Sequence, residues 1–326
     1  MATAAERTGA AAAPARAAER RRRRRRSALR RQGVALLFMA PWIIGFSAFY
    51  VYPMAASLYF SFTHYDILSQ PTWVGLANYR FMFGGDGLFW QAVRNTLWII
   101  AFLVPLQVAF GITAAMVLTR VKRGLSVYRT IFFLPTMVPL VAAALGFVFL
   151  LNPAGPINRI LHLLHLPEPL WFYDPHWTKP GLLLIGLWMV GQTMILFLAA
   201  LLDVPRQLYE AADLEGAGPW QRFRHVTLPM ISPVIFFSVV IGVINGFRYF
   251  TEAFVVSKAG DWDNPVGTPQ DSLLFYSSHL YNQGFEGFHM GYAAALSWVM
   301  FVVIMVCTLL LIRSSRRWVH YQGGFR

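Results

Sequence analysis

Six long apolar runs dominate this 326-residue sequence and decide what the chain can fold into. Each run is near or above the roughly 20 residues that an α-helix needs to cross a bilayer. Only 13% of the residues are charged, against about 25% in soluble domains. The sequence predicts an all-α polytopic membrane protein. Its six transmembrane helices are expected at residues 34–60, 91–119, 130–151, 180–202, 230–256 and 290–312.

The two ends of the chain lie outside these runs. Residues 1–33 are Ala-rich and basic, with seven consecutive arginines at 20–26, and we expect a disordered tail. Such a tract can bind nucleic acid or anionic headgroups, and its place just before an apolar run favours the membrane surface. We therefore expect membrane lipids, and no nucleic acid, as its partner. Residues 313–326 form the second tail, and residues 34–312 the transmembrane domain.

The distribution of basic residues predicts the sidedness of the chain. Six crossings return the chain to the side on which it started. Of the 28 Lys and Arg, 22 fall in the two tails and in the connections that follow the second and fourth runs; the opposite side has five. Because basic residues accumulate on the cytoplasmic side, both termini are predicted to be cytoplasmic.

The sequence lacks the usual signatures of catalysis and nucleotide binding. It has one cysteine, Cys307, no Gly-x-x-x-x-Gly-Lys-Ser/Thr, no Gly-x-Ser-x-Gly and no His-Glu-x-x-His. His162 and His165 are three residues apart, a spacing compatible with either a metal site or interfacial packing, and no third ligand is near. We expect no catalytic residue, no metal and no cofactor bound by this chain.

The connection at residues 203–229 is the most ordered polar stretch between two apolar runs. Pro205 suits the first turn of a helix, and Gly216 suits a left-handed residue at the end of that helix. The small residues Ala211 and Ala212 share a side with Leu208 and Glu215 and permit close approach of another surface. The pattern fits either a docking helix or a helix lying on the membrane surface.

The amino-acid sequence of this connection resembles that of a known protein family. "EAADLEGAGPWQRFRHVTLPMISP" resembles the EAA loop of bacterial ABC-importer permeases, with Glu215 where that family usually has Asp. The matching residues are Glu210, Ala211, Ala212, Gly216, Ala217, Leu228 and Pro229.

Further stretches extend the resemblance over about residues 33 to 315. "WVGLANYRFMF", "FWQAVRNTL", "YRTIFFLPTMVP" and "GPINRIL" are similar to the first-subunit branch of carbohydrate-importer permeases, the maltose, lactose and glycerol-3-phosphate type. The resemblance implies a type I ABC importer-like permease core in the bacterial plasma membrane. It also implies three protein partners: a homologous second permease, an ATP-binding-cassette ATPase dimer that uses ATP and Mg, and an extracytoplasmic solute-binding protein.

In this family the EAA loop is the coupling helix that docks on the ATPase. Carried over residue by residue, this role implies contacts by Glu210, Ala211, Ala212, Glu215, Gly216, Ala217, Arg222 and Phe223.

Polar and small residues inside the fourth and fifth runs are candidates for the solute pathway, since such residues tend to face a bundle interior. Asn245, Tyr249 and Glu252 have helical spacing and are expected on one face. Arg248 and Glu252 are either ligands or a structural pair. The full candidate set, in which hydrogen-bonding groups and aromatic faces suit a sugar or polyol, is Trp188, Gln192, Asn245, Arg248, Tyr249 and Glu252.

Two other functions remain open from the sequence. One is a membrane-embedded enzyme acting on lipid-linked sugar, which requires a cluster of acid and base groups inside the membrane. The other is a stand-alone secondary carrier, in which the polar module at 203–229 has no purpose.

Overall fold

A computed structural model describes residues 37–121, 123–259, 261 and 263–320. The chain divides into two compact units, residues 1–59 and 60–326. The predicted basic tail at 1–33 and the last residues of the second tail lie outside the described residues.

The first unit is helical over its described part. It contains the π-helical segment η1 (Ser47–Val51) and most of α2 (Tyr52–Phe60), within a candidate span at Leu37–Phe60. Large apolar side chains such as Phe38 and Phe49 are exposed along it. An apolar helix exposed in this way is expected to meet lipid or other helices.

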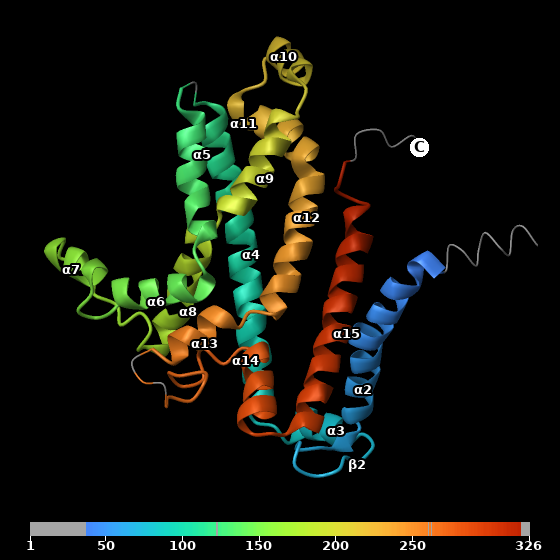
Figure 1. The fold of residues 1–326 in the computed structure, drawn as a ribbon. Coiled ribbons are helices and arrows are strands. Elements are labelled where there is room, and N and C mark those ends of the chain that lie inside the picture. The colour runs from blue at the N-terminus through green and yellow to red at the C-terminus, as the bar shows by residue number, and fades with distance from the viewer. Residues whose placement is uncertain (1–36, 122, 260, 262, 321–326) are drawn as a thin grey trace, which may run out of the picture. The chain divides into compact units, whose positions relative to one another are not determined.

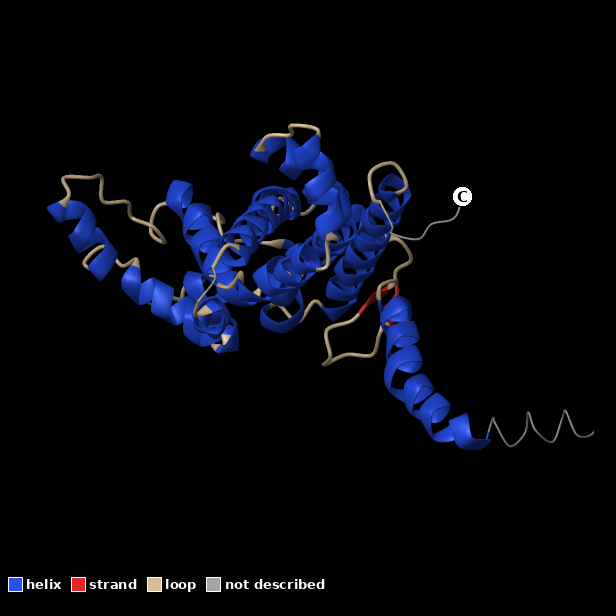
Figure 2. Ribbon diagram, turned by 90° about the horizontal axis from the view of Figure 1, so that it is seen from above, coloured by secondary structure: helices blue, strands red, loops and turns tan. Residues whose placement is uncertain are grey.

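The second unit holds all the remaining elements, which are helices except for one short antiparallel pair of strands. The strands β1 (Thr63–His64) and β2 (Thr72–Trp73) pair Thr63 with Trp73 (Figure 2). The helical elements are α3 (Ala77–Gly84), α4 (Phe89–Thr119), α5 (Leu125–Phe133), η2 (Leu134–Met137), α6 (Leu140–Leu150), α7 (Pro156–Leu163), α8 (Pro175–Trp188), α9 (Gly191–Leu202), α10 (Arg206–Leu214), α11 (Pro219–Arg222), η3 (Phe223–Thr227), α12 (Leu228–Phe247), α13 (Thr251–Ser257), α14 (Tyr276–Tyr281), η4 (Asn282–Glu286) and α15 (Met290–Ser315).

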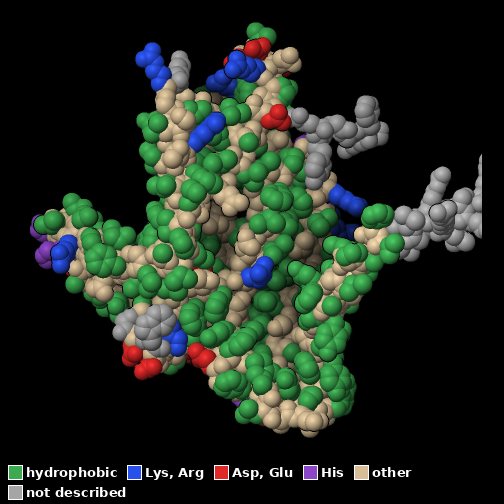
Figure 3. All heavy atoms as spheres, in the orientation of Figure 1, with side chains coloured by type: hydrophobic (Ala, Val, Ile, Leu, Met, Phe, Trp, Pro, Cys, Tyr) green, Lys and Arg blue, Asp and Glu red, His purple; other side chains and the backbone are tan. Residues whose placement is uncertain are grey.

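Helix α4 is the centre of this unit. It packs against α8, α9, α12 and α14, and α15 packs against α12 and α14 (Figure 1). The helices α10 and α14 lie at opposite ends of the bundle, which we call the α10 end and the α14 end. Hydrophobic side chains cover most of the visible face between these ends (Figure 3).

The prediction of six continuous spans is confirmed only in part. Among the residues that the structure describes, four helical stretches are long and apolar enough to cross a membrane, and two further pairs of helices pass only when each pair is taken as one span. The third predicted span bends by 97° between η2 and α6, and the fourth by 50° between α8 and α9. Pro139 precedes α6 with an extended ψ of 134°, which ends the preceding helical path.

The fifth predicted span is also interrupted. Helix α12 ends at Phe247, and α13 begins only at Thr251. Asn245, Tyr249 and Glu252 therefore do not share one face of a continuous helix, as their spacing predicted. The chain turns at residues 248–250 instead, where Phe250 has φ −142° and ψ −59°.

The break between α8 and α9 brings two backbones into contact. A Cβ on Gly191, the first residue of α9, would lie 2.1 Å from the carbonyl oxygen of Phe132. Only glycine allows this approach, because the obstacle is backbone and cannot turn aside as a side chain can. Gly191 is buried, so it packs helices together.

Buried polar side chains hold the long connection between α13 and α15 at the α14 end. The amide of Asn95 on α4 donates to the carbonyls of Asp271 and Leu274, both at 2.8 Å. Asp86, which precedes α4, accepts from the hydroxyl of Tyr292 at 2.5 Å and lies 2.6 Å from Nε2 of His279. Burial opposes the charge of Asp86, but these partners and backbone N–H groups outweigh it and lower the pKa of its carboxyl.

We predict that Gly191→Ala destabilises the folded protein by about 1–3 kcal/mol or more, since the added methyl group forces α9 away from α5. The midpoint of thermal unfolding in detergent measures this. Gly146→Ala in α6 is the matched control, because no atom lies within 4 Å of its Cβ position. Equal midpoints for the two variants would contradict the packing role of Gly191.

We also predict that Asp86→Asn lowers the free energy of unfolding by about 1–3 kcal/mol, because it removes a charged acceptor from a buried network. Because the pKa of Asp86 is lowered in the folded state, its carboxylate stabilises the folded protein fully when the pH is above its ordinary pKa of about 4. This stabilisation is lost as the pH falls through the lowered pKa. Unfolding midpoints measured across acid pH should show a smaller acid loss for Asp86→Asn than for the exposed control Asp263→Asn.

Candidate functional site

The α10 end of the bundle is a compact helix–turn–helix formed by α10 and α11. Gly216 has φ +77°, the left-handed conformation predicted for it. Around that turn, the N–H of Ala217 donates to the carbonyl of Ala212 at 2.9 Å, which satisfies a free carbonyl at the helix end. Gln221 then receives the N–H of Gly218 at 2.8 Å where α11 begins.

Side chains fasten this module to the base of α12. Arg222 donates to Asp213 at 2.6 Å, an ion pair between the two short helices. The hydroxyl of Tyr209 lies 3.0 Å from that of Thr227, which is buried just before α12. Tyr209 thus joins α10 to the residue that directly precedes α12.

The predicted coupling residues differ in how far they are exposed on the module. Glu210, Ala211, Glu215 and Gly216 are exposed, whereas Ala212 and Ala217 are half-buried. The sequence analysis missed Leu214, which is 92% exposed and is the most prominent apolar side chain of α10. Leu214 does not lie on the side of the helix that Leu208, Ala211, Ala212 and Glu215 share.

Arg222 and Phe223, the last two predicted coupling residues, face the protein itself. Arg222 makes the internal ion pair with Asp213, and Phe223 lines a groove between α4 and α12. We therefore interpret both as residues that hold the module in place.

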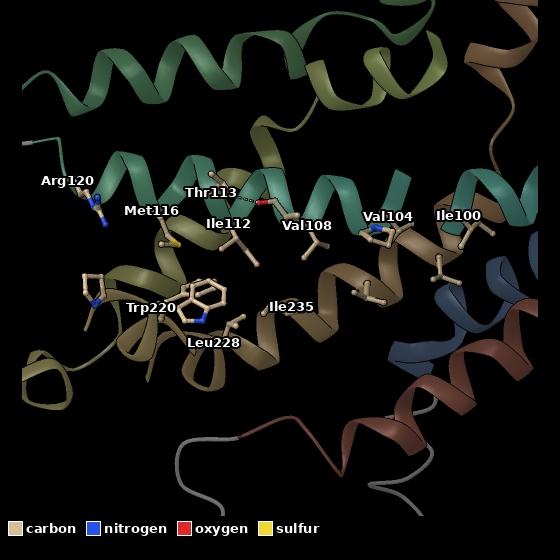
Figure 4. Close-up of a pocket in the computed structure, with 16 residues that line it drawn as sticks. Ile100, Val104, Val108, Ile112, Thr113, Met116, Arg120, Trp220, Leu228 and Ile235 are labelled. Carbon is tan, nitrogen blue, oxygen red and sulfur yellow. Dashed lines mark hydrogen bonds between the residues drawn. The ribbon is translucent and has the colours of Figure 1, made fainter. Parts of the chain in front are cut away.

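The groove is apolar and has a volume of about 890 Å³. Figure 4 shows Ile112 and Met116 of α4 opposite Leu228 and Ile235, with Trp220 at the α10 end. Arg120 contributes a basic side chain at that end.

Farther toward the α14 end, a cavity of about 410 Å³ is rich in polar groups. It lies where α12 is interrupted, between α4, α8 and α13. The polar side chains that line it are Gln107, Asn245, Arg248, Tyr249, Thr251 and Glu252. A smaller neighbouring cavity of about 210 Å³ shares Asn245 and Gln107 and adds Gln192, Thr193 and Ser238.

One buried polar group of the larger cavity has no hydrogen-bond partner in the described part of the chain. The hydroxyl of Tyr249 is buried without a hydrogen bond among the residues that the structure describes. Within the same residues, no ion pair joins Arg248 to Glu252, so the predicted alternative of a structural pair is not what the structure contains. Because a buried unpaired hydroxyl costs about 1–3 kcal/mol, Tyr249 is suited to bind a ligand.

The predicted pathway residues are thus largely brought together. Asn245, Arg248, Tyr249 and Glu252 line one cavity and Gln192 the next, whereas Trp188 packs edge-on against Phe147 at 5.6 Å and lines neither. Gln107, which lies in the apolar middle of α4, was not among the predicted residues. Its amide donates to the carbonyl of Gly186 at 2.9 Å.

His162 and His165 were considered from the sequence as either a metal site or interfacial packing. His162 lies 2.7 Å from Glu168, and both side chains are exposed. In the described part of the chain, no three His, Cys, Asp or Glu residues gather closely enough to hold a metal ion.

Comparison with known proteins identifies the architecture. Residues 107–320 match the family described as binding-protein-dependent transport system inner membrane component. The chain belongs to this family. It is 38% identical to a probable ABC transporter permease protein, YesP, of Bacillus subtilis, over 91% of this chain and 95% of that relative.

Two further relatives and one solved structure are also similar to this chain. The lactose transport system permease LacF of Rhizobium radiobacter is 32% identical over 86% of this chain and 93% of its own length. The arabinooligosaccharide transport permease AraP of Bacillus subtilis is 30% identical over 87% and 89%. A bacterial ABC transporter that imports the acidic polysaccharide alginate superposes with a TM-score of 0.75 at 26% identity, over 88% of this chain and 96% of that one.

The permease is therefore a multi-pass membrane protein with the type I ABC importer fold, as the sequence resemblance implied. Its family is a transport component, in which hydrolysis of ATP is carried out by other subunits.

We predict that Tyr249→Phe weakens solute uptake by the assembled transporter up to about tenfold, mainly through KM, because one ligand hydrogen bond is lost. Thermal stability should not fall, since the hydroxyl has no protein partner. Tyr128→Phe, in the exposed part of α5, is the control. Unchanged uptake with Tyr249→Phe would remove this residue from the binding site.

Proposed function

We propose that this chain is the permease subunit of an ATP-driven sugar importer and forms half of its translocation pathway. A homologous second permease supplies the other half. An extracytoplasmic binding protein delivers the solute, in keeping with the family description. An ATPase dimer that uses ATP and Mg drives the cycle from the cytoplasm.

The observation that carries this proposal is the mechanical link between the α10 module and the polar cavity. The module is fixed to α12 through Tyr209 and Thr227, and α12 ends at the cavity, where Arg248 and Tyr249 lie. Movement of α10 by a docked ATPase therefore moves one wall of the cavity. Exposed Glu210 and Leu214 are the residues best placed to contact that partner.

A sugar is the substrate class that the site and the relatives favour together. Amide, hydroxyl, guanidinium and carboxylate groups line the cavity, and all of these hydrogen-bond to sugar hydroxyls. The relatives are named for lactose and arabinooligosaccharide transport, and the solved neighbour for alginate import. Thermal-shift screening of the cognate binding protein against a panel of sugars would identify the solute.

The proposed orientation places the α10 end in the cytoplasm. It follows from the charge distribution in the sequence, since the connections nearest α10 carry most of the basic residues outside the tails. The α14 end then faces the binding protein.

The two other functions suggested by the sequence have less support. An enzyme acting on lipid-linked sugar requires paired acid and base groups, and Glu252 is the only carboxylic acid among the residues that line the polar cavity. A secondary carrier gives no role to the α10 module, which is the most elaborately bonded polar structure at its end of the bundle.

We predict that Glu210→Lys and Gly216→Pro each abolish uptake and the stimulation of ATPase activity by solute, while the protein still inserts. The first reverses an exposed charge on α10. The second is incompatible with the φ of +77° at the turn. Gly218→Ala is the control, because its φ of −70° suits alanine. Normal uptake in both test variants would exclude coupling through α10.

A further inference from the structure

Two basic side chains, Arg94 of α4 and Lys179 of α8, lie near each other at the α14 end and outside the polar cavity. Arg94 is exposed and Lys179 half-buried, and the charge of Arg94 acts on Lys179. Their neighbours in sequence fix this arrangement. Asn95 donates to the carbonyl of Asp271, and Thr178 donates to the hydroxyl of Ser272, so both helices are fastened to one segment.

Neither basic group has an acidic partner in the described part of the chain. The ion pairs found there involve other residues, and Asp271 pairs with neither cation. Arg94 is hydrogen-bonded only to the neutral side chain of Gln91. Two like charges repel each other at short range, so an anion that bridges them stabilises the folded protein.

The surroundings of this pair are aromatic and apolar. The ammonium group of Lys179 lies 5.6 Å from the ring centre of Trp98, and that ring is 4.6 Å from Phe102. Phe102 and Leu97 are each about half exposed, at 52% and 51%. A ligand at this place therefore meets two positive charges at one end and an apolar surface along the helix.

The depth of the pair matches lipid phosphates. Helix α4 has 31 residues, about 46 Å at 1.5 Å per residue, whereas the hydrocarbon core is about 30 Å thick. About five residues at each end therefore extend into the headgroup region. Arg94 is the sixth residue of α4, at the boundary where phosphates lie and where Trp side chains gather.

We propose that Arg94 and Lys179 bind the phosphate of an anionic phospholipid, with an acyl chain lying along Trp98 and Phe102. The aromatic side chains of Trp98 and Phe102 beside the two charges favour a lipid over a soluble anion. The site is also distinct from the sugar cavity. That cavity is lined by Ile99 and Leu103, about 100° around the helix axis from Trp98 and Phe102.

Lipid binding to the purified full-length permease in its complex tests this proposal. Native mass spectrometry and thermal unfolding would compare phosphatidylglycerol with phosphatidylcholine of the same acyl chains, in an uncharged detergent. Arg94→Gln with Lys179→Gln is the test variant. Arg80→Gln with Arg159→Gln is the matched control, because it removes two exposed charges from other helices.

The wild type and the control are expected to bind phosphatidylglycerol about tenfold or more tightly than phosphatidylcholine, and the test variant to lose that preference. Arg94→Gln alone should show a partial loss and serves if the double variant does not fold. Equal preference in the test and control variants would overturn the proposal. Stabilisation of the wild type by inorganic phosphate to the same extent, without lipid, would overturn the lipid assignment.

Discussion

The bundle depends on how closely neighbouring backbones approach one another where side chains are absent. At Gly191 the start of α9 touches the carbonyl of Phe132, which fixes α9 against α5. Gly242 and Gly246 let α12 come close to the side chains of Val104 and Ile100 of α4. These contacts bring α9 against α5 and α12 against α4. Close packing at small residues is how helices associate where lipid replaces water.

The polar cavity lies where α12 is interrupted. Where α12 stops at Phe247 and the chain turns before α13, Arg248 and Tyr249 are directed into the space beside α4. Irregular backbone at membrane depth is tolerated only where protein or a cavity surrounds it. The break therefore belongs to the site, and α12 connects it to the module at the opposite end.

Much of this architecture was predictable from the sequence, and the failures have identifiable physical causes. Apolar run lengths predicted the spans, and Gly216 predicted its own left-handed turn. The bends in the third and fourth spans were missed because apolar composition does not report where a helix breaks. Spacing placed Asn245 and Glu252 on one face, and the break at 248–250 overrode that prediction. Leu214 and Gln107 were missed because their roles depend on tertiary packing.

We propose that α10 transmits the work of an ATPase to the cavity through α12, which requires α10 to contact that ATPase. Photo-crosslinking would test this contact. A photoreactive amino acid would replace Leu214 in α10 and, in a separate variant, Leu163 in α7, both of which are exposed. We expect an adduct with the ATP-hydrolysing subunit from position 214 and none from position 163. Capture of that subunit from position 163, or its absence at position 214 in an active transporter, would exclude docking through α10.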